Sequence, residues 1–196
     1  MSVAAVVLAA GASRRLGRPK QEVIIGRETL LERAVRLACE ASLSPIIVVT
    51  RADTDYSRAL QSAGSVVIGM NLEADEGIAS SIRCGISLAS SHDVAGAVIL
   101  SCDQPVLRAE HLRQLIEDHS RITGSAYAGS VGVPAYFPAA TFPLLLQLRG
   151  DAGARKLLTN ARAILAEDLR LDVDTEQDLA TARALLETGS GEADLN

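Results

Sequence analysis

The chain has 196 residues, 48% of them hydrophobic and 22% charged, a balance that suits one globular domain with a sizeable core. A formal net charge of −5 and an aromatic content of 3% argue against a basic nucleic-acid-binding surface and against aromatic platforms for single-stranded nucleic acid. The apolar run near the start is preceded by no basic residue and is shorter than the roughly 20 apolar residues of a membrane span, so we expect neither a signal peptide nor a membrane partner.

Short apolar runs alternate along the chain with stretches whose apolar residues have helical spacing. The predicted strands span 3–8, 46–50, 66–68, 94–102 and 164–167, and the stretch 125–137 holds one or two more, interrupted by glycines. The predicted helices span 30–41, 56–63, 78–88, 109–119, 141–148, 152–158 and 175–186. Thr29 and Glu32 are placed to form a capping box before the first helix, and the small, polar tail 188–196 is expected to be flexible.

This alternation predicts a single domain over residues 1–187 with a three-layer α/β/α fold. The central sheet should be mostly parallel, with helices on both faces, because its strands are continuously apolar. Ligands of such sheets bind beyond the carboxyl ends of the strands. Gly11 and Asp103 each follow a predicted strand, so both should face the same crevice.

The first candidate site follows the first predicted strand, where residues 8–20 read LAAGASRRLGRPK. Small residues after a strand let the backbone approach a ligand closely, and successive backbone N–H groups can cradle phosphate oxygens. Arg14, Arg15, Arg18 and Lys20 add four cations within seven residues of an otherwise acidic chain. A solvated basic loop is the alternative, since the segment is neither a Walker A loop nor a G-x-G-x-x-G fingerprint.

Asp103 lies in the sequence SCDQP, directly after a predicted buried strand. It is either a turn residue, since aspartate and proline favour turns, or a ligand of Mg²⁺, which prefers oxygen ligands and takes one or two carboxylates together with substrate phosphates. In the segment EGIASSIRCG, residues 76–85, Gly77 and two serines precede or begin a predicted helix. They suit contacts to an anion or a base through backbone N–H groups, and simple helix capping is an equal alternative.

Taken together, the motifs of this chain resemble those of the MobA-like nucleotidyltransferases, and most of all the branch of molybdenum cofactor cytidylyltransferases. The resemblance rests on L-A-A-G-x-S-x-R-x-G-x-P-K at 8–20, E-G-x-x-x-S-x-x-x-G at 76–85, C-D-Q-P at 102–105, G-x-P at 132–134, G-D-x-G-A-R at 150–155 and D-V-D-T at 172–175. It implies a Rossmann-like, nucleotide-diphospho-sugar transferase (GT-A-like) fold. The aromatic residue that the family usually carries before the glycine of the second motif is absent, since residues 72–75 read LEAD.

The resemblance also implies a role for individual residues. The expected sites are Arg15 and Lys20 for catalysis; Leu8, Ala9, Ala10, Gly11, Ser13, Gly77 and Ser81 for nucleotide binding; Asp103 and Asp174 for the metal; and Gly132, Pro134, Asp151 and Arg155 for the acceptor. Asp172 is a weaker metal candidate, Thr175 is expected to be a helix N-cap, and Asp151 has an N-cap of the next helix as its structural alternative.

The implied reaction is the Mg²⁺-dependent transfer of a nucleoside monophosphate from an NTP, with release of pyrophosphate. Ala10, in place of a second glycine, and Gln104, after the metal aspartate, favour CTP over GTP. The implied acceptor is molybdopterin that carries molybdenum, a phosphorylated pterin, and the implied partner is a molybdoenzyme that receives the product by transient contact. Two alternatives stay open: a nucleotidyltransferase with a sugar- or alcohol-phosphate acceptor, and a non-catalytic factor that delivers the cofactor.

The remaining reactive residue types suggest no second chemistry. Cys39, Cys84 and Cys102 are far apart in the sequence and include no C-x-x-C pair, so we expect a reduced, cytoplasmic setting without a disulfide framework or a structural zinc. The three histidines have no metal-ligand spacing, and hydrolase motifs such as G-x-S-x-G are absent.

Overall fold

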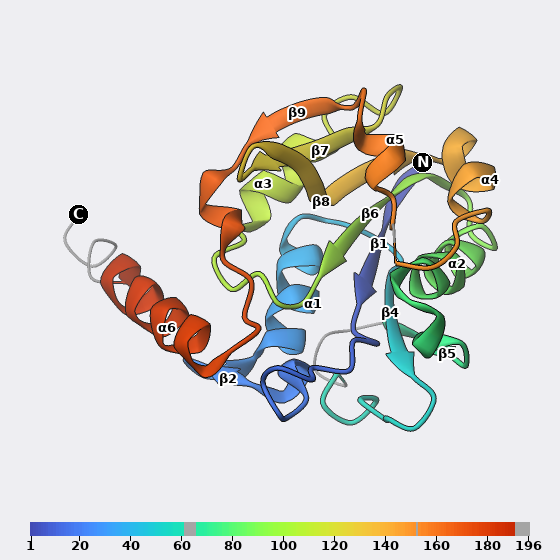
Figure 1. The fold of residues 1–196 in the computed structure, drawn as a ribbon. Coiled ribbons are helices and arrows are strands. Elements are labelled where there is room, and N and C mark those ends of the chain that lie inside the picture. The colour runs from blue at the N-terminus through green and yellow to red at the C-terminus, as the bar shows by residue number, and fades with distance from the viewer. Residues whose placement is uncertain (61–65, 152, 191–196) are drawn as a thin grey trace.

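The computed structural model describes residues 1–60, 66–151 and 153–190. Seven strands form one sheet in the order β5-β4-β1-β6-β8-β7-β9, and β2 and β3 form a separate hairpin (Figure 1). Neighbouring strands of the sheet are parallel except in the two pairs that contain β8, which confirms the mostly parallel sheet. The strands are β1 Ser2–Leu8, β2 Ile24–Ile25, β3 Glu28–Thr29, β4 Ile46–Arg51, β5 Val66–Asn71, β6 Val94–Ser101, β7 Thr123–Tyr127, β8 Ser130–Pro138 and β9 Arg162–Leu165.

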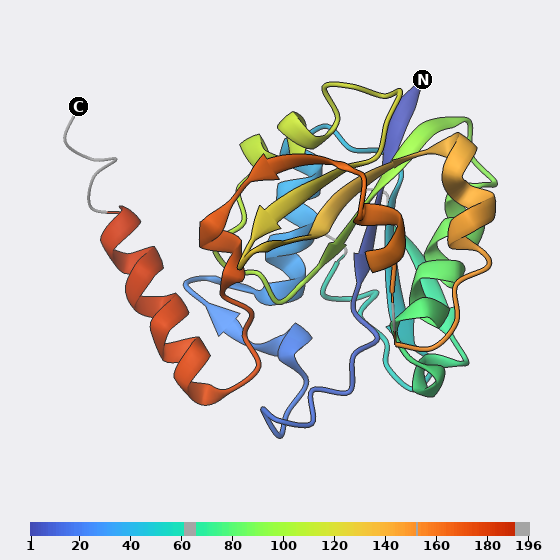
Figure 2. The same cartoon turned by 45° about the horizontal axis from the view of Figure 1, so that its top comes forward.

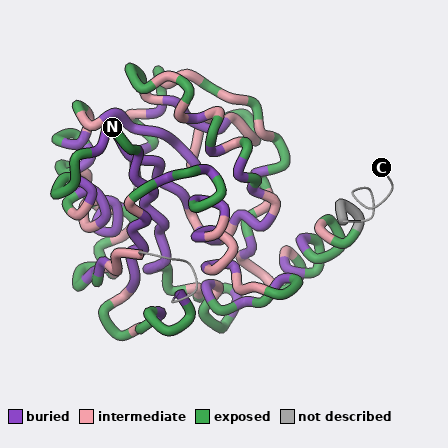
Figure 3. Tube along the Cα trace, turned by 180° about the vertical axis from the view of Figure 1, so that it is seen from behind, coloured by how far each residue is buried: buried purple, intermediate pink, exposed green. Residues whose placement is uncertain are grey.

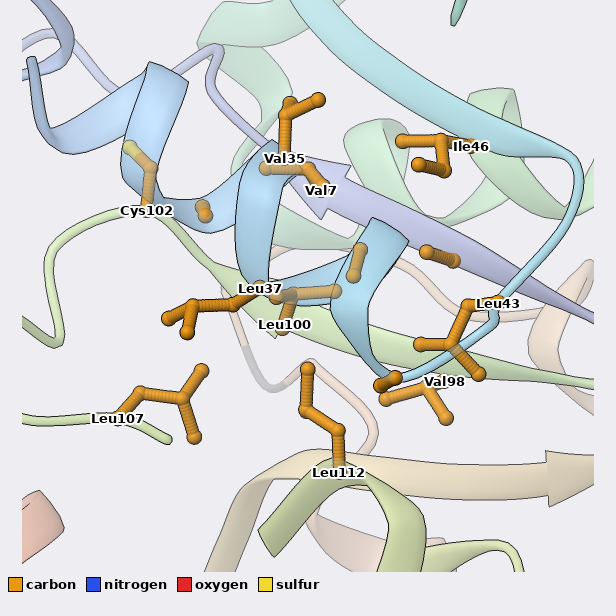
Figure 4. Close-up of a cluster of buried hydrophobic side chains, with 14 of the residues drawn as sticks. Val7, Val35, Leu37, Leu43, Ile46, Val98, Leu100, Cys102, Leu107 and Leu112 are labelled. Carbon is orange, nitrogen blue, oxygen red and sulfur yellow. The ribbon is translucent and has the colours of Figure 1, made fainter. Parts of the chain in front are cut away.

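Helices cover both faces of the sheet, as predicted, because the side chains of each strand alternate between the two faces. Val3, Ala5 and Val7 of β1 pack on the face covered by α1 (Leu30–Glu40) and α3 (Ala109–Leu115). The intervening residues of β1 pack on the other face, with α2 (Ile78–Ala89), α4 (Phe142–Leu145) and α5 (Arg155–Leu158). Figure 4 shows buried side chains on the α1 face, and in Figure 3 buried residues lie in the interior of the trace while exposed residues lie on its outer turns.

The last helix, α6 (Glu176–Ser190), does not cover the sheet. Its buried Leu179 and Ala182 pack instead with Val23 and Ile25, beside the β2–β3 hairpin, and with Val173. Figures 1 and 2 show α6 projecting beside the main body of the protein. None of the described helices combines the length and the apolar character that a membrane span requires.

Several predicted boundaries are corrected by local backbone chemistry. The helix predicted over 109–119 ends at Leu115, because the Asp118 carboxylate accepts hydrogen bonds from the backbone and hydroxyl groups of Ser120 and so favours a turn. The stretch 125–137 belongs to two strands, joined at Ala128 and Gly129, whose φ angles of +49° and +73° suit a tight hairpin. The last predicted strand lies earlier, in β9, and a short 3-10 helix follows it.

Two helix predictions are wrong in part. Residues 57–60 of the helix predicted over 56–63 form a turn, and residues 61–63 lie outside the described residues. The helix predicted over 152–158 begins at Arg155 with Ala154 as its N-cap, so Asp151 does not cap it. The capping box of α1 is confirmed: the Thr29 hydroxyl accepts from the Glu32 backbone N–H at 3.1 Å, and the Glu32 carboxylate accepts from the Thr29 N–H at 2.7 Å. The flexibility expected of the tail is not tested, because residues 191–196 also lie outside the described ranges.

The sheet register places the two principal motifs at one edge. Leu8, the last residue of β1, lies beside Val49 of β4 on one side and Ser101 of β6 on the other. In Figure 1 the arrowheads of β1, β4 and β6 point to the same edge, where the loop after β1 lies. The loop that contains Gly11 and the turn that contains Asp103 therefore leave adjacent strands, as the sequence predicts.

Candidate active site

A cleft of about 380 Å³ lies at this edge of the sheet, between the loop after β1, the end of β6 and the start of α2. The sequence-predicted residues that line it are Leu8, Ala10, Gly11, Lys20, Gly77, Ser81, Asp103 and Asp151. A larger hollow, about 470 Å³, lies between the β2–β3 hairpin and α6 and contains none of the predicted residues. The cleft at the strand ends is therefore the candidate site, because it gathers residues of four motifs that are distant in the sequence.

Buried hydrogen bonds fix the shape of the loop after β1. Ala9 is buried, and its N–H donates to the Val49 carbonyl at 2.8 Å. The Gln21 side-chain amide donates to the carbonyls of Ala9 at 2.6 Å and Gly11 at 3.2 Å. Ser13 has a φ of +48°, and its hydroxyl accepts from the Lys20 N–H at 3.0 Å. Ala9 and Ser13 thus shape the loop and do not line the cleft.

Two buried amides support the site although no motif predicts them. Gln21 directly follows the proline–lysine pair of the first motif, which is the signal that could have identified it. Asn71 ends β5. The Asn71 amide donates to the hydroxyls of Ser80 at 2.8 Å and Ser81 at 2.9 Å. Asn71 therefore holds the start of α2 against the sheet edge and places Ser81 on the wall of the cleft.

The electrostatic centre of the site is Lys20, whose ammonium nitrogen bridges two carboxylates. Lys20 Nζ lies 2.6 Å from Asp103 Oδ2 and 2.9 Å from Asp174 Oδ1, so these two oxygens are separated by at most the sum of the two distances. The side chains of Lys20, Asp103 and Asp174 are 13%, 14% and 29% exposed. Burial lowers the pKa of Lys20, but the adjacent Asp103 and Asp174 carboxylates outweigh burial and raise this pKa above its ordinary value.

The remaining oxygens of the two carboxylates also have partners. Arg15, 74% exposed, lies with its guanidinium 2.5 Å from Asp174 Oδ2. The Ser101 hydroxyl donates to Asp103 Oδ1. Every oxygen of Asp103 and Asp174 therefore already has a hydrogen-bond partner in the structure.

A backbone hydrogen bond explains why Asp174 meets Asp103 across 71 positions of the sequence. The N–H of the buried Val173 donates to the Asp103 carbonyl at 2.9 Å, which ties the segment before α6 to the turn after β6. Asp172 is an exposed residue whose carboxyl group is nevertheless partly shielded from water. This burial, followed by the negative charges of Asp103 and Asp174, raises the pKa of Asp172 to about 7, and the positive charge of Lys20 opposes the shift. Thr175 caps α6, as predicted, by accepting from the Asp178 N–H at 3.2 Å.

The donor set at this centre fits a magnesium ion. Two carboxylates that meet at one cation offer the hard oxygen ligands that Mg²⁺ prefers, and substrate phosphates and water complete such sites. Among the described residues there is no group of three or more His, Cys, Asp or Glu that could hold a metal ion without a substrate. Asp103 and Asp174 could thus hold a metal that arrives together with phosphate.

The four cations of the loop do not all face the cleft. Arg14 and Lys20 line the cleft, whereas Arg18 points to α6, where it pairs with Glu176 at 2.7 Å. Arg15, paired with Asp174, does not line the cleft but borders the carboxylate centre. The side of the cleft formed by this loop is therefore its cationic side.

The acceptor residues implied by the resemblance are not brought together. Gly132 and Pro134 flank Val133, whose carbonyl accepts from the Tyr127 hydroxyl at 2.7 Å and from the Gln104 amide at 3.2 Å. This segment of β8 lies next to the Asp103 turn through Gln104 but does not line the cleft.

Arg155 is the exposed first residue of α5 and also does not line the cleft, whereas Asp151 does, beside Gly77. Gln104 itself is buried and donates to the Val133 and Leu169 carbonyls, so the residue that favoured CTP by resemblance makes a structural contact outside the cleft.

Comparison with known proteins places this site in a family. The family model for the MobA-like NTP transferase domain matches residues 5–166. The chain belongs to the MobA-like NTP transferase family. "Purine catabolism protein PucB" of Bacillus subtilis (strain 168) is 32% identical over 165 residues, which cover 80% of each chain. A "Probable molybdenum cofactor guanylyltransferase" of Opitutus terrae is 30% identical over 109 residues, which cover 55% of this chain and 51% of the relative.

Solved structures confirm the fold. Rv0371c of Mycobacterium tuberculosis H37Rv is 30% identical with a TM-score of 0.75, over 94% of this chain and 99% of that one, and has also been solved in complex with manganese. A nucleotidyl transferase of Methanothermobacter, 24% identical over 95% of this chain and 99% of that one, shares the fold with a TM-score of 0.79. The chain is thus a nucleotidyltransferase of this family, and the narrower cytidylyltransferase branch is part of the proposal below.

Proposed function

We propose that this MobA-like transferase moves CMP from CTP onto a phosphorylated pterin, molybdopterin that carries molybdenum, and releases pyrophosphate. The observation that carries the proposal is the bridge made by Lys20 between Asp103 and Asp174 at the edge of the cleft. It joins a cation suited to phosphate and a carboxylate pair suited to Mg²⁺ at one point. A carrier protein needs neither a paired metal site nor a cation poised beside it.

The loop after β1 is proposed to hold the triphosphate. Its backbone at Ala10 and Gly11 lines the cleft with no side chain beyond Cβ, and a Cβ at Gly11 would meet no atom within 4 Å. Arg14 and Lys20 face the same space. An anion there gains both backbone N–H donors and two positive charges. Among the described residues that line the cleft, the remaining cation is Arg51, which is paired with Asp75.

Asp103 and Asp174 are proposed to hold Mg²⁺ together with the substrate's phosphates. When bound, the ion screens the negative charge of those phosphates. In the structure the same carboxylates pair with Lys20 and Arg15. Phosphate oxygens would compete for these two cations, and Asp103 and Asp174 would then be the residues that hold the ion. The manganese complex of Rv0371c, a relative of similar fold, supports a divalent ion in this family.

The chain's own residues then contribute position and charge. An oxygen of the acceptor phosphate attacks the α-phosphorus, the bond from that phosphorus to the bridging oxygen of the β-phosphate breaks, and pyrophosphate leaves with the bond's electrons. Lys20 and Arg15 are proposed to neutralise the charge that builds up on the phosphate oxygens and the leaving group. In-line transfer of this kind requires no side chain to form a covalent intermediate.

The acceptor is proposed to enter from the side of residues 132–134 of β8, with Arg155 as a further candidate contact. The Gln104 amide links this segment to the Asp103 turn, which supports an acceptor site beside the metal. The pterin acceptor is supported by the name of the Opitutus terrae relative, a probable molybdenum cofactor guanylyltransferase. The same name makes GTP the principal competitor of CTP.

The test is pyrophosphate release with CTP, GTP, UTP and ATP, each with and without molybdenum-loaded molybdopterin. We expect release with CTP that depends on the acceptor and on Mg²⁺. Asp103→Asn should lower the rate by at least about 10²-fold, the cost typical of removing one preorganised electrostatic group. Asp93→Asn, at an exposed carboxylate at the opposite end of β6, is the matched control and should act like the wild type. Pyrophosphate release with GTP alone would contradict the assignment of CTP as the substrate. Release only with a sugar phosphate would contradict the assignment of the pterin as the acceptor.

A further inference from the structure

The carboxylate of Asp151 lies on the cleft wall against the start of α2. A Cβ atom built on Gly77 would lie 2.1 Å from Asp151 Oδ1, so this oxygen occupies the space above a glycine. Gly77 has a φ of +121°, a backbone conformation that residues other than glycine rarely adopt. Asp151 accepts no hydrogen bond from the residues that the structure describes, although it lines the cleft. It is a carboxylate without a partner in the place where a ligand is expected.

Several contacts fix Asp151 in this position. The Gly150 carbonyl accepts from the Ala79 N–H of α2 at 3.1 Å, and the Gly150 N–H donates to Glu76 Oε1 at 3.2 Å. Arg83, also on α2, pairs with Glu76 at 2.5 Å. The loop before α5 is therefore docked on the start of α2, and Asp151 follows the docked residue directly.

Cationic and acidic side chains line different parts of the cleft. Arg14 and Lys20 lie on the side of the β1 loop, whereas the acidic residues Asp75 and Asp151 line the cleft near the start of α2. Asp75 is neutralised by Arg51 at 3.2 Å, so Asp151 is the acidic group there without a cation. A carboxylate repels phosphate, and this end of the cleft must therefore take the part of the nucleotide that donates hydrogen bonds.

Apolar surface beside Asp151 favours a base over a ribose. Ala74 and Ile78 line the same wall, and the Ile78 side chain is 42% exposed although it is large and apolar. Such a surface suits the flat face of a base, while a carboxylate at its border suits the hydrogen-bond donors on the edge of that base. A ribose would place polar hydroxyls over these carbon atoms.

We propose that Asp151 selects the base of the nucleotide by accepting a hydrogen bond from its exocyclic amino group. This inference rests on the proposed function, which it deepens by naming the feature of the substrate that is recognised. Cytosine presents an amino group at position 4 where uracil presents a carbonyl oxygen, and a carboxylate attracts the first and repels the second. Asp151 thus acts in specificity and not, as the resemblance implied, in binding the acceptor.

The experiment is the equilibrium affinity for CTP and for UTP in Mg²⁺, measured by calorimetry without acceptor. Wild type should prefer CTP, and Asp151→Asn should reduce the CTP-to-UTP affinity ratio by about 10- to 100-fold, the range for a hydrogen bond to a charged group. Asp93→Asn should leave the ratio unchanged. Affinity for Mg–pyrophosphate, which occupies only the phosphate end, should be the same in all three proteins and shows that the variant is folded.

Each outcome is decisive. An unchanged ratio in Asp151→Asn overturns the inference, and so does an equal loss of CTP and UTP affinity, which would place the ribose at Asp151. A wild-type preference for UTP overturns it as well. A preference for GTP over UTP that collapses in the variant supports it, because guanine also offers amino hydrogens. Failure of the wild type to bind any NTP would refute the proposed function itself, which separates the two claims.

Discussion

Replacing Lys20 with methionine tests the arrangement on which the site depends. Methionine keeps most of the side-chain length and removes the charge that holds Asp103 and Asp174 together at 2.6 and 2.9 Å. Two facing carboxylates are then left with Arg15 and Ser101 as their remaining donors. We expect the variant to be less stable than the wild type in the absence of divalent ions and to bind a divalent ion without nucleotide.

The magnitude follows from burial. Removing one partner of a fully buried ion pair costs about 3–5 kcal/mol. Asp174 is partly exposed and keeps its pair with Arg15, so solvent screening reduces the expected loss to about 1–3 kcal/mol. For a chain of this length that corresponds to a fall in melting temperature of roughly 3–10 °C. Turnover should fall by about 10²–10³-fold, as for the loss of one preorganised charge.

The assay is thermal unfolding of wild type, Lys20→Met and Lys156→Met in EDTA and in MnCl₂. Lys156, the other lysine of the chain, is exposed on α5 and serves as the matched control. Manganese should raise the melting temperature of Lys20→Met more than that of the other two proteins, because a ligand that binds only the folded state stabilises it. The reasoning is refuted if Lys20→Met is as stable as the wild type in EDTA and gains nothing more from manganese.

Three further predictions concern other parts of the structure. Gly77→Ala should weaken CTP binding in calorimetry and destabilise the protein by more than about 1–3 kcal/mol, the cost of an unfavourable φ alone, because its Cβ also meets the Asp151 carboxylate. Burial lowers the pKa of His111, so stability should decline as the pH falls from about 6.5, where the unfolded chain takes up a proton first; urea unfolding of His111→Gln should show a smaller decline. Burial raises the pKa of Cys102 to about 12, so at pH 8 a thiol reagent should modify the exposed Cys39 quickly and Cys102 only on unfolding.

Each of these has a result that would count against it. Gly129→Ala has the same kind of unfavourable φ but no atom near its Cβ, so equal losses of stability and CTP affinity in both glycine variants would remove the role given to Asp151. Parallel acid sensitivity in wild type and His111→Gln would exclude His111 as its source. Rapid labelling of Cys102 in the folded protein would show that its strand end is open to solvent.

The carboxyl edge of the sheet could be predicted from the sequence because local signals determine it. The β-branched run of β1 and the apolar run of β6 indicate buried strands, and Gly11 and Asp103 mark where they end. Parallel strands bring such ends to one edge whatever lies between them. Gly11 and Asp103 were therefore found from their positions, and both line one cleft.

What the sequence could not predict depends on long-range packing. The position of Asp151 on the cleft wall follows from docking of Gly150 on α2, which no local pattern encodes. The placement of α6 beside the β2–β3 hairpin likewise depends on a small separate cluster around Leu179. The helix at 109–119 ended early because the Asp118 side chain competes for the backbone, and propensity alone does not settle such a competition.

The central claim is that the cationic loop and the two distant carboxylates bind one metal–nucleotide complex. The most direct measurement is the anomalous diffraction signal of manganese in crystals grown with a non-hydrolysable CTP analogue. We expect a single peak within coordination distance of oxygens of Asp103, Asp174 and a phosphate, with Lys20 turned to the phosphates. A nucleotide bound elsewhere, or manganese with no ligand from either aspartate, would contradict it.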